Sequence, residues 1–344
     1  MRLDSTDYLP LDAPQCLGAT PAGATFATSS GDIIELECFG DGAFRLRSGP
    51  NTRPDYGIVT GSARACTSDL TQAHRWTFDS GHAVLELSGP PLALRLLWHG
   101  RPVLTSATDE RADGSPRLPA LGRLRHGGLW SAAFALASGE AIYGLGEKFG
   151  PLDKRGQLVH SRVAQAAGVN TGLSSRSAPF GWSPGIGAGA WGVFVHTPGT
   201  VTHAVGNPEW SHRSYAVMVE DEALDLFLFA AADPAGIVDL YTQVTGRPRA
   251  VPRWSLGLWI GRAGDADPGD AEALVAHMRG RRLPCDVVSL AVRGAGSTNA
   301  GFDFTWDALH DRDPAETVAR IKSHQVRVCV REAPTIAVGT ALYD

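Results

Sequence analysis

The sequence lacks several features that would place the protein in a specialised class. No apolar run approaches the roughly 20 residues needed to span a bilayer, so we expect no membrane partner. Basic and acidic residues nearly balance, 31 against 36, and the net charge of −5 is small, which argues against nucleic acid as a partner. The cysteines form no C-x-x-C pair, so we expect neither a zinc motif nor a redox motif.

We expect a cytoplasmic location. The opening residues, MRLDSTDYLPLDAP, contain acidic groups and no apolar core, and therefore do not resemble a secretory signal. An odd number of cysteines, scattered along the chain, is typical of reduced thiols rather than a disulfide framework. They are Cys16, Cys38, Cys66, Cys285 and Cys329. No cofactor and no metal cluster is indicated.

Between about residues 20 and 250, apolar and polar residues alternate over short runs. This period of two marks half-buried strands and predicts an antiparallel β-sandwich. His99 and Gly100 are expected to form a tight turn after one such strand. A later hairpin is predicted with its turn at 220–222, where Asp221, Glu222 and Asp225 would be solvated. Its alternating apolar residues are Tyr215, Val217 and Val219 on one arm and Leu224, Leu226 and Leu228 on the other.

Two polar, glycine-rich stretches interrupt the alternation. Residues 106–128 are predicted to form a surface excursion, and residues 163–188 a long loop. A loop of that length in a compact domain is usually functional.

After Pro248 the period changes. The run 254–260 is apolar and of strand length, and Ala271, Leu274, Val275 and Met278 follow it at helical spacing. Strands are predicted at 286–292 and 326–330, with a second helix between them that begins at Asp313, Pro314 and Glu316. Apolar strands that alternate with helices are typical of parallel βα units.

Five segments occur in the order and spacing of glycoside hydrolase family 31, which the chain resembles. They are YGLGEKFGPLDKRGQ (143–157), APFGWSP (178–184), VDLYTQVTGRPRAVPRWSLGLWI (238–260), FDFTWD (302–307) and RVCVREAP (327–334). The family includes α-glucosidases and α-xylosidases. The resemblance implies a mainly β protein, with a galactose-mutarotase-like sandwich over 1–250 and, over 251–344, the first three βα units of an incomplete (β/α)8 barrel.

The resemblance also implies the chemistry. A retaining glycosidase needs two carboxyl groups about 5 Å apart, a nucleophile and an acid/base. In the family these are aspartates after the fourth and sixth barrel strands. A whole barrel takes about 250 residues, and only three strands fit after Trp254. We therefore expect neither catalytic aspartate in this sequence, and no catalytic residue is assigned.

Substrate-binding candidates follow from the same resemblance, and these are Trp259, Asp303, Trp306 and Gln165. Several family positions are altered. Ala291 and Gly294 stand where the family has Asp and Trp. Arg331, Ala333, Pro334 and Thr335 stand where it has Trp and Asn-Pro-Tyr, and Gln165 stands where it has an acid. Binding of an α-linked oligosaccharide is expected to be weak or lost.

Structural roles compete with these assignments. Trp254 and Trp259 could be core residues of the first barrel strand, and Gly144 and Gly146 suit turns that need open backbone angles. The histidines His196, His203 and His212 lack ligand spacing and are expected to be structural.

Three hypotheses remain open. The chain could be the inactive front part of an α-glycosidase, or one half of a split enzyme that a second chain completes. It could also be a non-catalytic carbohydrate-binding module, which would require exposed aromatic side chains on the sandwich. The candidates for that role are Trp130, Trp182, Trp191 and Trp210.

Overall fold

The computed structural model describes residues 8–12, 15–49, 56–107, 119–124, 129–164, 174, 176–261, 268–291, 313–331, 335–336, 338–340 and 342–343. The chain divides into two compact units, Met1–Pro248 and Arg249–Asp344, and each is described by itself.

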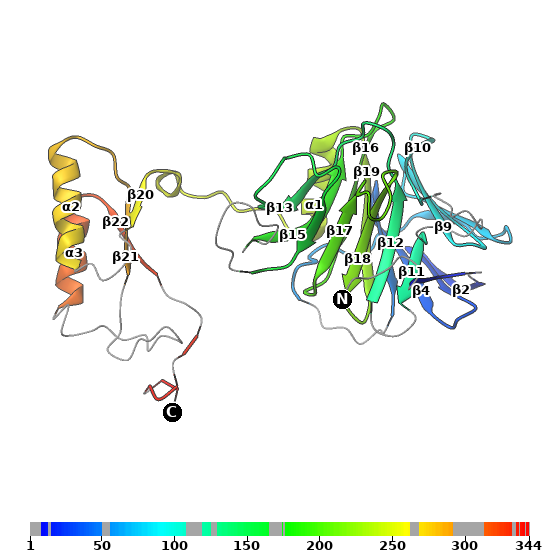
Figure 1. Ribbon diagram of the computed structural model, residues 1–344, viewed down its shortest axis with the longest axis horizontal. Coiled ribbons are helices and arrows are strands. Elements are labelled where there is room, and N and C mark those ends of the chain that lie inside the picture. Colours follow the sequence, from blue (N-terminus) through cyan, green and yellow to red (C-terminus); the bar gives the residue numbers. More distant parts are fainter. Residues whose placement is uncertain are drawn as a thin grey trace. The chain divides into compact units, whose positions relative to one another are not determined.

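The first unit is built from antiparallel sheets (Figure 1). The largest has eight strands in the order β13-β15-β16-β19-β5-β4-β3-β2. Their bounds are Tyr143–Gly146 (β13), Ser177–Ser183 (β15), Ala190–Val195 (β16), Leu224–Ala231 (β19), Ala43–Ser48 (β5), Ile33–Gly40 (β4), Gly23–Ala27 (β3) and Gln15–Thr20 (β2).

Two further sheets complete this unit. A six-stranded sheet has the order β1-β11-β12-β18-β17-β14, and a five-stranded sheet has the order β10-β9-β8-β7-β6. The bounds in the six-stranded sheet are Tyr8–Pro10 (β1), Leu121–Leu124 (β11), Leu129–Ala135 (β12), Ser214–Glu220 (β18), Val201–Val205 (β17) and Leu158–Ser161 (β14). Those in the five-stranded sheet are Arg101–Thr105 (β10), Ala93–Trp98 (β9), Ala83–Ser88 (β8), Arg75–Asp79 (β7) and Thr67–Asp69 (β6).

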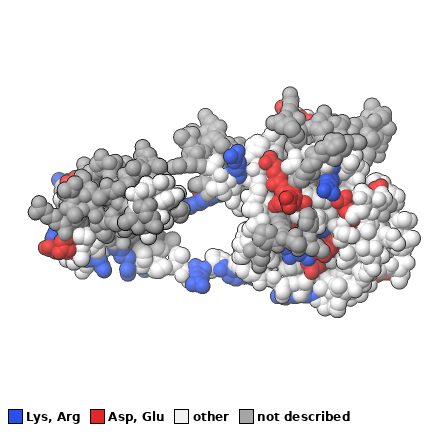
Figure 2. Space-filling model, turned by 90° about the horizontal axis from the view of Figure 1, so that it is seen from below, with Lys and Arg blue, Asp and Glu red and all other residues white. Residues whose placement is uncertain are grey.

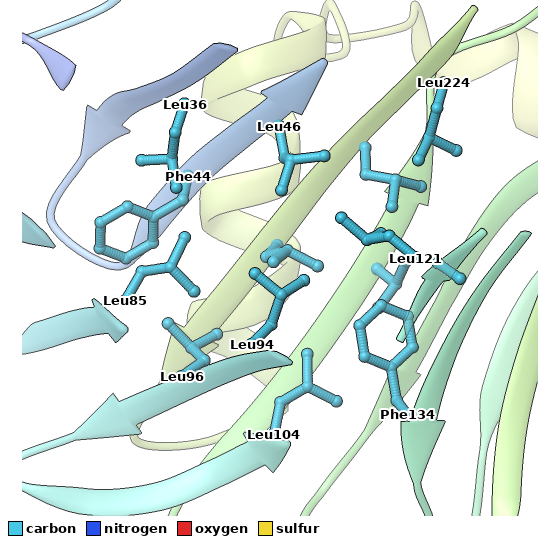
Figure 3. Packing of buried hydrophobic residues seen from close by; sticks show 14 of the residues in the cluster. Leu36, Phe44, Leu46, Leu85, Leu94, Leu96, Leu104, Leu121, Phe134 and Leu224 are labelled. Carbon is cyan, nitrogen blue, oxygen red and sulfur yellow. The ribbon is translucent and has the colours of Figure 1, made fainter. Parts of the chain in front are cut away.

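One apolar core lies between these sheets, and Figure 3 shows part of it. Every second residue of β4 points into it, because side chains alternate across a strand, so Leu36 and Ile34 are fully buried. Leu85 and Leu94 come to the same core from the five-stranded sheet, and Phe134 from the six-stranded sheet. Truncation of such a leucine to alanine typically costs about 2–5 kcal/mol.

The prediction of a hairpin with its turn at 220–222 is wrong. β18 pairs with β12 and β17, whereas β19 pairs with β16 and β5, so the two strands belong to different sheets. The connection after Glu220 crosses from one sheet to the other. Tyr215 and Leu224 nevertheless share the predicted core, because both sheets face it.

The two predicted surface stretches are wrong in part. β11 lies within 106–128, and its Leu121 is fully buried. β15 lies within 163–188 and pairs with both β13 and β16. The tight turn at His99–Gly100 is confirmed, since both residues have positive φ, 48° and 73°.

Helix α1 (Pro234–Thr245) packs on the outer face of the eight-stranded sheet. Asp233 caps it by accepting a hydrogen bond from the Gly236 amide at 2.9 Å. Beneath the helix, Phe180 stacks on Tyr241 with ring centroids 4.0 Å apart, within a second apolar cluster.

The second unit contains the predicted parallel sheet, in the order β20-β21-β22, with two helices. The bounds are Arg253–Leu256 (3-10 helix η2), Trp259–Gly261 (β20), Pro268–Gly280 (α2), Val287–Ala291 (β21), Pro314–Ser323 (α3) and Arg327–Arg331 (β22). The run at 254–260 is not one strand, because η2 occupies its first half. Val275 and Met278 are buried as their spacing predicts, and the Asp313 side chain accepts from the Glu316 amide at 2.9 Å, as expected of a cap.

Candidate functional site

The face of the parallel sheet that is turned away from α2 and α3 is the candidate site. Ile260, Val288 and Val328 pack in the cluster that includes residues of both helices. Side chains one position away along each strand therefore lie on the opposite face, which we call the inner face. The register sets its described residues in two rows, Trp259, Val287 and Arg327 first, then Gly261, Ser289 and Cys329 nearer the carboxyl ends.

Two tryptophans meet near the amino end of this face. The Trp259 side chain lies 6.1 Å from Trp254, centroid to centroid, and its indole N–H donates to the Ser255 carbonyl at 3.0 Å. The Arg327 guanidinium sits 4.4 Å from the centroid of the Trp254 ring. Trp254 therefore has both Arg327 and Trp259 as neighbours. Trp259 is 45% exposed and keeps aromatic surface open to a ligand.

The Asp286 carboxylate has a structural role at the amino end of the sheet. Asp286 accepts a hydrogen bond from the Leu258 amide at 3.1 Å, and its own amide donates to the Leu258 carbonyl at 2.9 Å. A Cβ at Gly257 would lie 2.1 Å from the Asp286 carboxylate, so a larger residue there would displace this carboxylate. Asp286 precedes β21, and active sites of (β/α)8 barrels lie at the other end of the strands.

Of the predicted substrate-binding residues, only Trp259 lies within the described residues. Gln165, Asp303 and Trp306 lie outside them. The backbones of Ala291 and Arg331 are paired at the last positions of β21 and β22. The family resemblance implies polar or aromatic groups at these positions. No carboxylate stands among the inner-face residues that the structure describes, so the described part of this face offers stacking but no acid or nucleophile.

Lys148 lies in the sandwich segment 143–157, which resembles the family. Lys148 donates to the His160 carbonyl at 2.8 Å and to the Ser177 hydroxyl at 2.7 Å. Burial lowers the pKa of the Lys148 ammonium, and nearby Lys154 lowers it further. Sequence reasoning did not single out Lys148, because its partners are distant in the chain.

Gly144 and Gly146 have a structural role in this segment, the alternative to a role in function. Gly146 has a φ of 80°, and a Cβ there would lie 2.4 Å from the Arg176 carbonyl oxygen. Gly144 has a φ of 97° and a similarly close approach to the Phe180 carbonyl. Both residues therefore serve the pairing of β13 with β15.

His203 is part of a buried polar chain in the sandwich. Its Nδ1 lies 2.8 Å from the Tyr215 hydroxyl, and its Nε2 lies 3.1 Å from the Ser161 hydroxyl. Burial lowers the pKa of His203 to about 3 and raises that of Tyr215. The imidazole is therefore neutral near pH 7, in keeping with the structural role expected for it.

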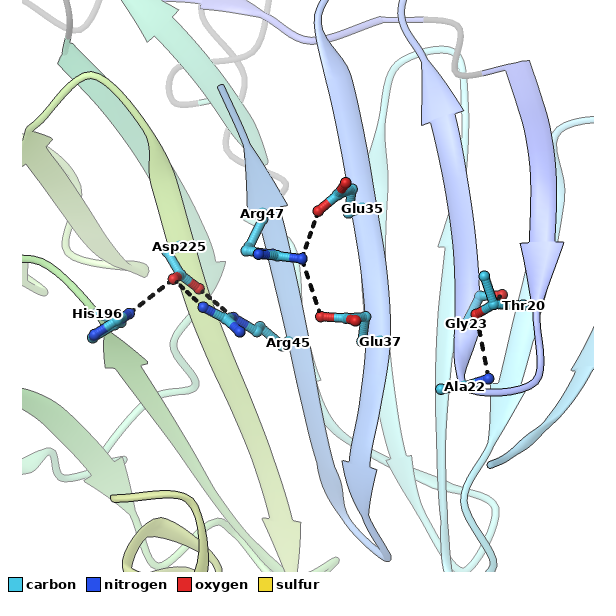
Figure 4. Close-up of polar contacts among 9 residues, drawn as sticks. All are labelled: Thr20, Ala22, Gly23, Glu35, Glu37, Arg45, Arg47, His196 and Asp225. Atoms are coloured by element: carbon cyan, nitrogen blue, oxygen red, sulfur yellow. Dashed lines mark hydrogen bonds and ion pairs between the residues drawn. The ribbon is translucent and has the colours of Figure 1, made fainter. Parts of the chain in front are cut away.

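Asp225 corrects the prediction of a solvated acid. Its side chain is 3% exposed, and it accepts two hydrogen bonds from Arg45, at 2.9 and 2.7 Å, and one from His196 at 2.9 Å (Figure 4). Burial raises the pKa of this carboxyl, but the bonds from Arg45 and His196 outweigh burial and hold it below its ordinary value. Position 225 is buried because β19 runs through the middle of its sheet.

The four tryptophans proposed as an exposed sugar platform are mostly inside the protein. Trp130 and Trp191 are fully buried and Trp210 is 9% exposed. Trp182 is half-buried with its ring 5.0 Å from that of Tyr143. These residues therefore do not form an exposed aromatic row.

Other kinds of site find little support in the part of the chain that the structure describes. Within it, no three or more His, Cys, Asp or Glu side chains gather as a metal site would need, and no helix is both long and apolar enough to cross a membrane. On the face drawn in Figure 2, basic and acidic side chains both appear on the surface, as the near balance of charges implies.

Two family models match the chain. Residues 33–202 match the glycosyl hydrolase 31 N-terminal galactose mutarotase-like domain. Residues 248–344 match the glycosyl hydrolases family 31 TIM-barrel domain.

Curated relatives agree. An α-xylosidase of Emericella nidulans is 29% identical over 215 residues, which is 62% of this chain and 26% of the relative. The α-xylosidase XylQ of Lactiplantibacillus pentosus is 27% identical over 59% of this chain and 26% of its own length. The match thus spans about a quarter of these relatives.

Solved structures share the fold. A family 31 dextranase of Flavobacterium johnsoniae, complexed with glucose, superposes with a TM-score of 0.79 at 18% identity, over 96% of this chain and 39% of that one. A family 31 α-xylosidase from a soil metagenome, complexed with xylose, gives a TM-score of 0.74 at 20% identity, over 96% and 48% of the two chains. With its mutarotase-like sandwich and its parallel strands of the TIM-barrel domain, the chain belongs to glycoside hydrolase family 31.

Proposed function

We propose that residues 1–344 form the sandwich and the first three barrel units of a retaining α-glycosidase that acts on α-linked xylosides or glucosides. The observation that carries the proposal is the parallel pairing of β20, β21 and β22 directly after the sandwich, in the order of the matched domains. Relatives described as α-xylosidases and α-glucosidases support the substrate class.

In this proposal the chain binds and positions the sugar but does not cleave it. Trp259 presents an exposed indole on the inner face, and an aromatic ring can stack against the apolar C–H face of a pyranose. Cleavage with retention requires two carboxyl groups about 5 Å apart. We place both outside residues 1–344, since the described inner face carries none and the family supplies them after later strands.

A hydrolysis assay tests this function. Residues 1–344, expressed alone, are incubated with aryl α-xylosides and aryl α-glucosides, and we expect no saturable turnover above background. Binding of xylose and glucose, followed by saturation-transfer NMR, should be weak and should decrease in Trp259→Ala. Turnover by this chain alone would overturn the placement of the carboxylates, and equal sugar binding by Trp259→Ala would overturn the role of the indole.

A second polypeptide that supplies the remaining barrel units is the alternative. Apolar side chains around β20 favour it, because Leu256 is 76% exposed and Leu258 is 45% exposed. A complementary chain that covers them should raise the melting temperature of residues 1–344. Unchanged melting at high micromolar concentrations of both chains would count against this alternative.

A cytoplasmic location is part of the proposal. All five cysteines are free thiols, with Cys38 and Cys285 buried. This is the state that a reducing compartment maintains. Alkylation of the protein in cell extracts under non-reducing conditions tests it, with five modified thiols after unfolding as the expected result.

A further inference from the structure

Three tight turns of the sandwich meet at one place. Asp41 and Gly42 join β4 to β5, residues 80–82 join β7 to β8, and His99 and Gly100 join β9 to β10. The Gly42 amide donates to the Ser80 hydroxyl at 3.0 Å, and the His99 amide donates to the His82 carbonyl at 2.8 Å. We call Asp41, His82, Trp98 and His99 the turn cluster.

The turn cluster presents three aromatic rings together. His82 and Trp98 have centroids 5.5 Å apart with their planes tilted by 31°. His99 stands edge-on to both rings, 5.0 Å from each. Trp98 is half-buried. A Cβ on Gly189 would lie 3.0 Å from the Trp98 Cδ1, so the absence of a side chain at Gly189 allows its backbone to pack against the indole. His82 and His99 are exposed, which leaves an aromatic surface at the sandwich end.

Polar groups border these rings. The Asp41 carboxylate accepts a hydrogen bond from the His82 amide at 2.8 Å and pairs through its second oxygen with His82 Nδ1. Within the residues described, His82 Nε2 and both ring nitrogens of His99 have no hydrogen-bond partner. Each carboxylate oxygen can also accept a further bond. The Asp41 side chain is 40% exposed, so a ligand can reach it.

The turns hold these groups in fixed positions. His99 and Gly100 both have the positive φ of a type I′ hairpin turn, and both arms of that hairpin lie in the five-stranded sheet. His82 is fixed by bonds from its amide and its ring to one carboxylate. A ligand that binds here therefore orders few side chains, which favours binding.

We propose that the turn cluster binds a sugar unit of an α-linked oligosaccharide at a site apart from catalysis. This inference rests on the proposed function for its substrate class. A pyranose has an apolar C–H face that gains by covering an indole, and a rim of hydroxyls that need hydrogen-bond partners. Trp98 supplies the apolar surface, and Asp41, His82 and His99 supply acceptors and donors around it.

The turn cluster lies away from the described residues that flank Gln165, the substrate-binding candidate of the sandwich. Gly189, against Trp98, stands between β15 and β16, next to the end of β15 at Ser183. Lys148 and the bridge between Val163 and Ser174, which flanks residues 165–173, lie by the start of β15 at Ser177. A strand of this length spans roughly 20 Å. The turn cluster would thus hold a distant part of a substrate chain.

Native electrophoresis of residues 1–344 in gels that contain a soluble polysaccharide tests this inference. Dextran offers α-linked glucose and xyloglucan offers α-linked xylose. We expect retardation in at least one gel, and a loss of affinity of about tenfold or more in Trp98→Ala. His99→Asn removes the imidazole but keeps a residue that tolerates positive φ, and should weaken binding at least about threefold. His99→Asn decides the matter if Trp98→Ala does not melt cooperatively.

Leu17→Ala is the matched control, because Leu17 is an apolar sandwich residue that is 57% exposed and lies on β2, outside the turn cluster. It should leave retardation unchanged, and Trp259→Ala reports the separate contribution of the inner face. Unretarded wild-type protein in both gels, or equal retardation of the wild type, Trp98→Ala and His99→Asn, would overturn the inference. Retardation lost only in Trp259→Ala would also overturn it while leaving the proposed function standing. Turnover by residues 1–344 alone would instead refute the proposed placement of the catalytic groups and leave the turn cluster untouched.

Discussion

Removal of the Asp225 charge should destabilise the sandwich strongly. The carboxylate is 3% exposed and accepts three hydrogen bonds, two of them from Arg45, whose side chain is 15% exposed. Asp225→Asn keeps the shape but leaves the guanidinium without its counter-charge, where water barely reaches it. Breaking a buried pair in this way costs about 3–5 kcal/mol. That is a large fraction of the 5–15 kcal/mol by which a domain is typically stable.

Urea unfolding, followed by tryptophan fluorescence, measures the effect. Trp130 and Trp191 are fully buried in the sandwich and report its unfolding. The matched control is Arg47→Gln, since Arg47 pairs with Glu35 and Glu37 but is 40% exposed (Figure 4). An exposed pair of this kind contributes at most about 1 kcal/mol.

The double variant Arg45→Met with Asp225→Leu separates charge from packing. Replacing both members of a buried pair by apolar residues is often neutral, so the double variant should be more stable than Asp225→Asn. If Asp225→Asn costs no more than Arg47→Gln, the reasoning that burial makes this pair important is refuted.

Three further predictions follow from other parts of the chain. In the unfolded chain, His203 takes up a proton below its ordinary pKa of 6.5, whereas in the folded chain it does so only near pH 3. The free energy of unfolding should therefore fall by up to about 1.4 kcal/mol per pH unit as the pH drops between these values. His203→Gln should flatten this slope in urea titrations. Ala291→Asp with Arg331→Trp should restore no hydrolysis of aryl α-glycosides, because it adds neither nucleophile nor acid. In limited proteolysis with mass spectrometry, residues 249–344 should be cut before the sandwich, and early cuts in the sandwich with 249–344 protected would show that the stable unit is the other one.

Sequence patterns predicted secondary-structure elements correctly where the contacts of an element depend on residues close to it in the chain. The helical spacing of Val275 and Met278 and the cap at Asp313 depend on neighbours in the chain, and both are confirmed. The order of strand and helix after Pro248 likewise indicated parallel strands, because a crossover helix carries the chain back to the end of the sheet at which the previous strand began.

Alternation predicted faces but not partners. Tyr215 and Leu224 lie in the predicted core, yet their strands are in different sheets, because a period of two says which side is buried and not which strand is adjacent. Asp225 was expected in water for the same reason. Its neighbours Arg45 and His196 are brought to it only by strand order.

The candidate sites combine residues that are even farther apart in the sequence. The sequence predicted the turn at His99 and Gly100, but not that Asp41 and His82 would meet it from two other turns. The family resemblance named Trp259, which lies on the inner face, while Gln165, Asp303 and Trp306 stay predictions.

Labelling of the nucleophile tests the central claim most directly. A retaining glycosidase forms a covalent glycosyl-enzyme, and a fluorinated α-glycosyl fluoride allows that intermediate to accumulate. Residues 1–344 are incubated with the xylosyl and glucosyl reagents, and the intact mass is measured. We expect an unchanged mass with both reagents. A stoichiometric adduct of one sugar, mapped to a carboxylate of this chain, would contradict it.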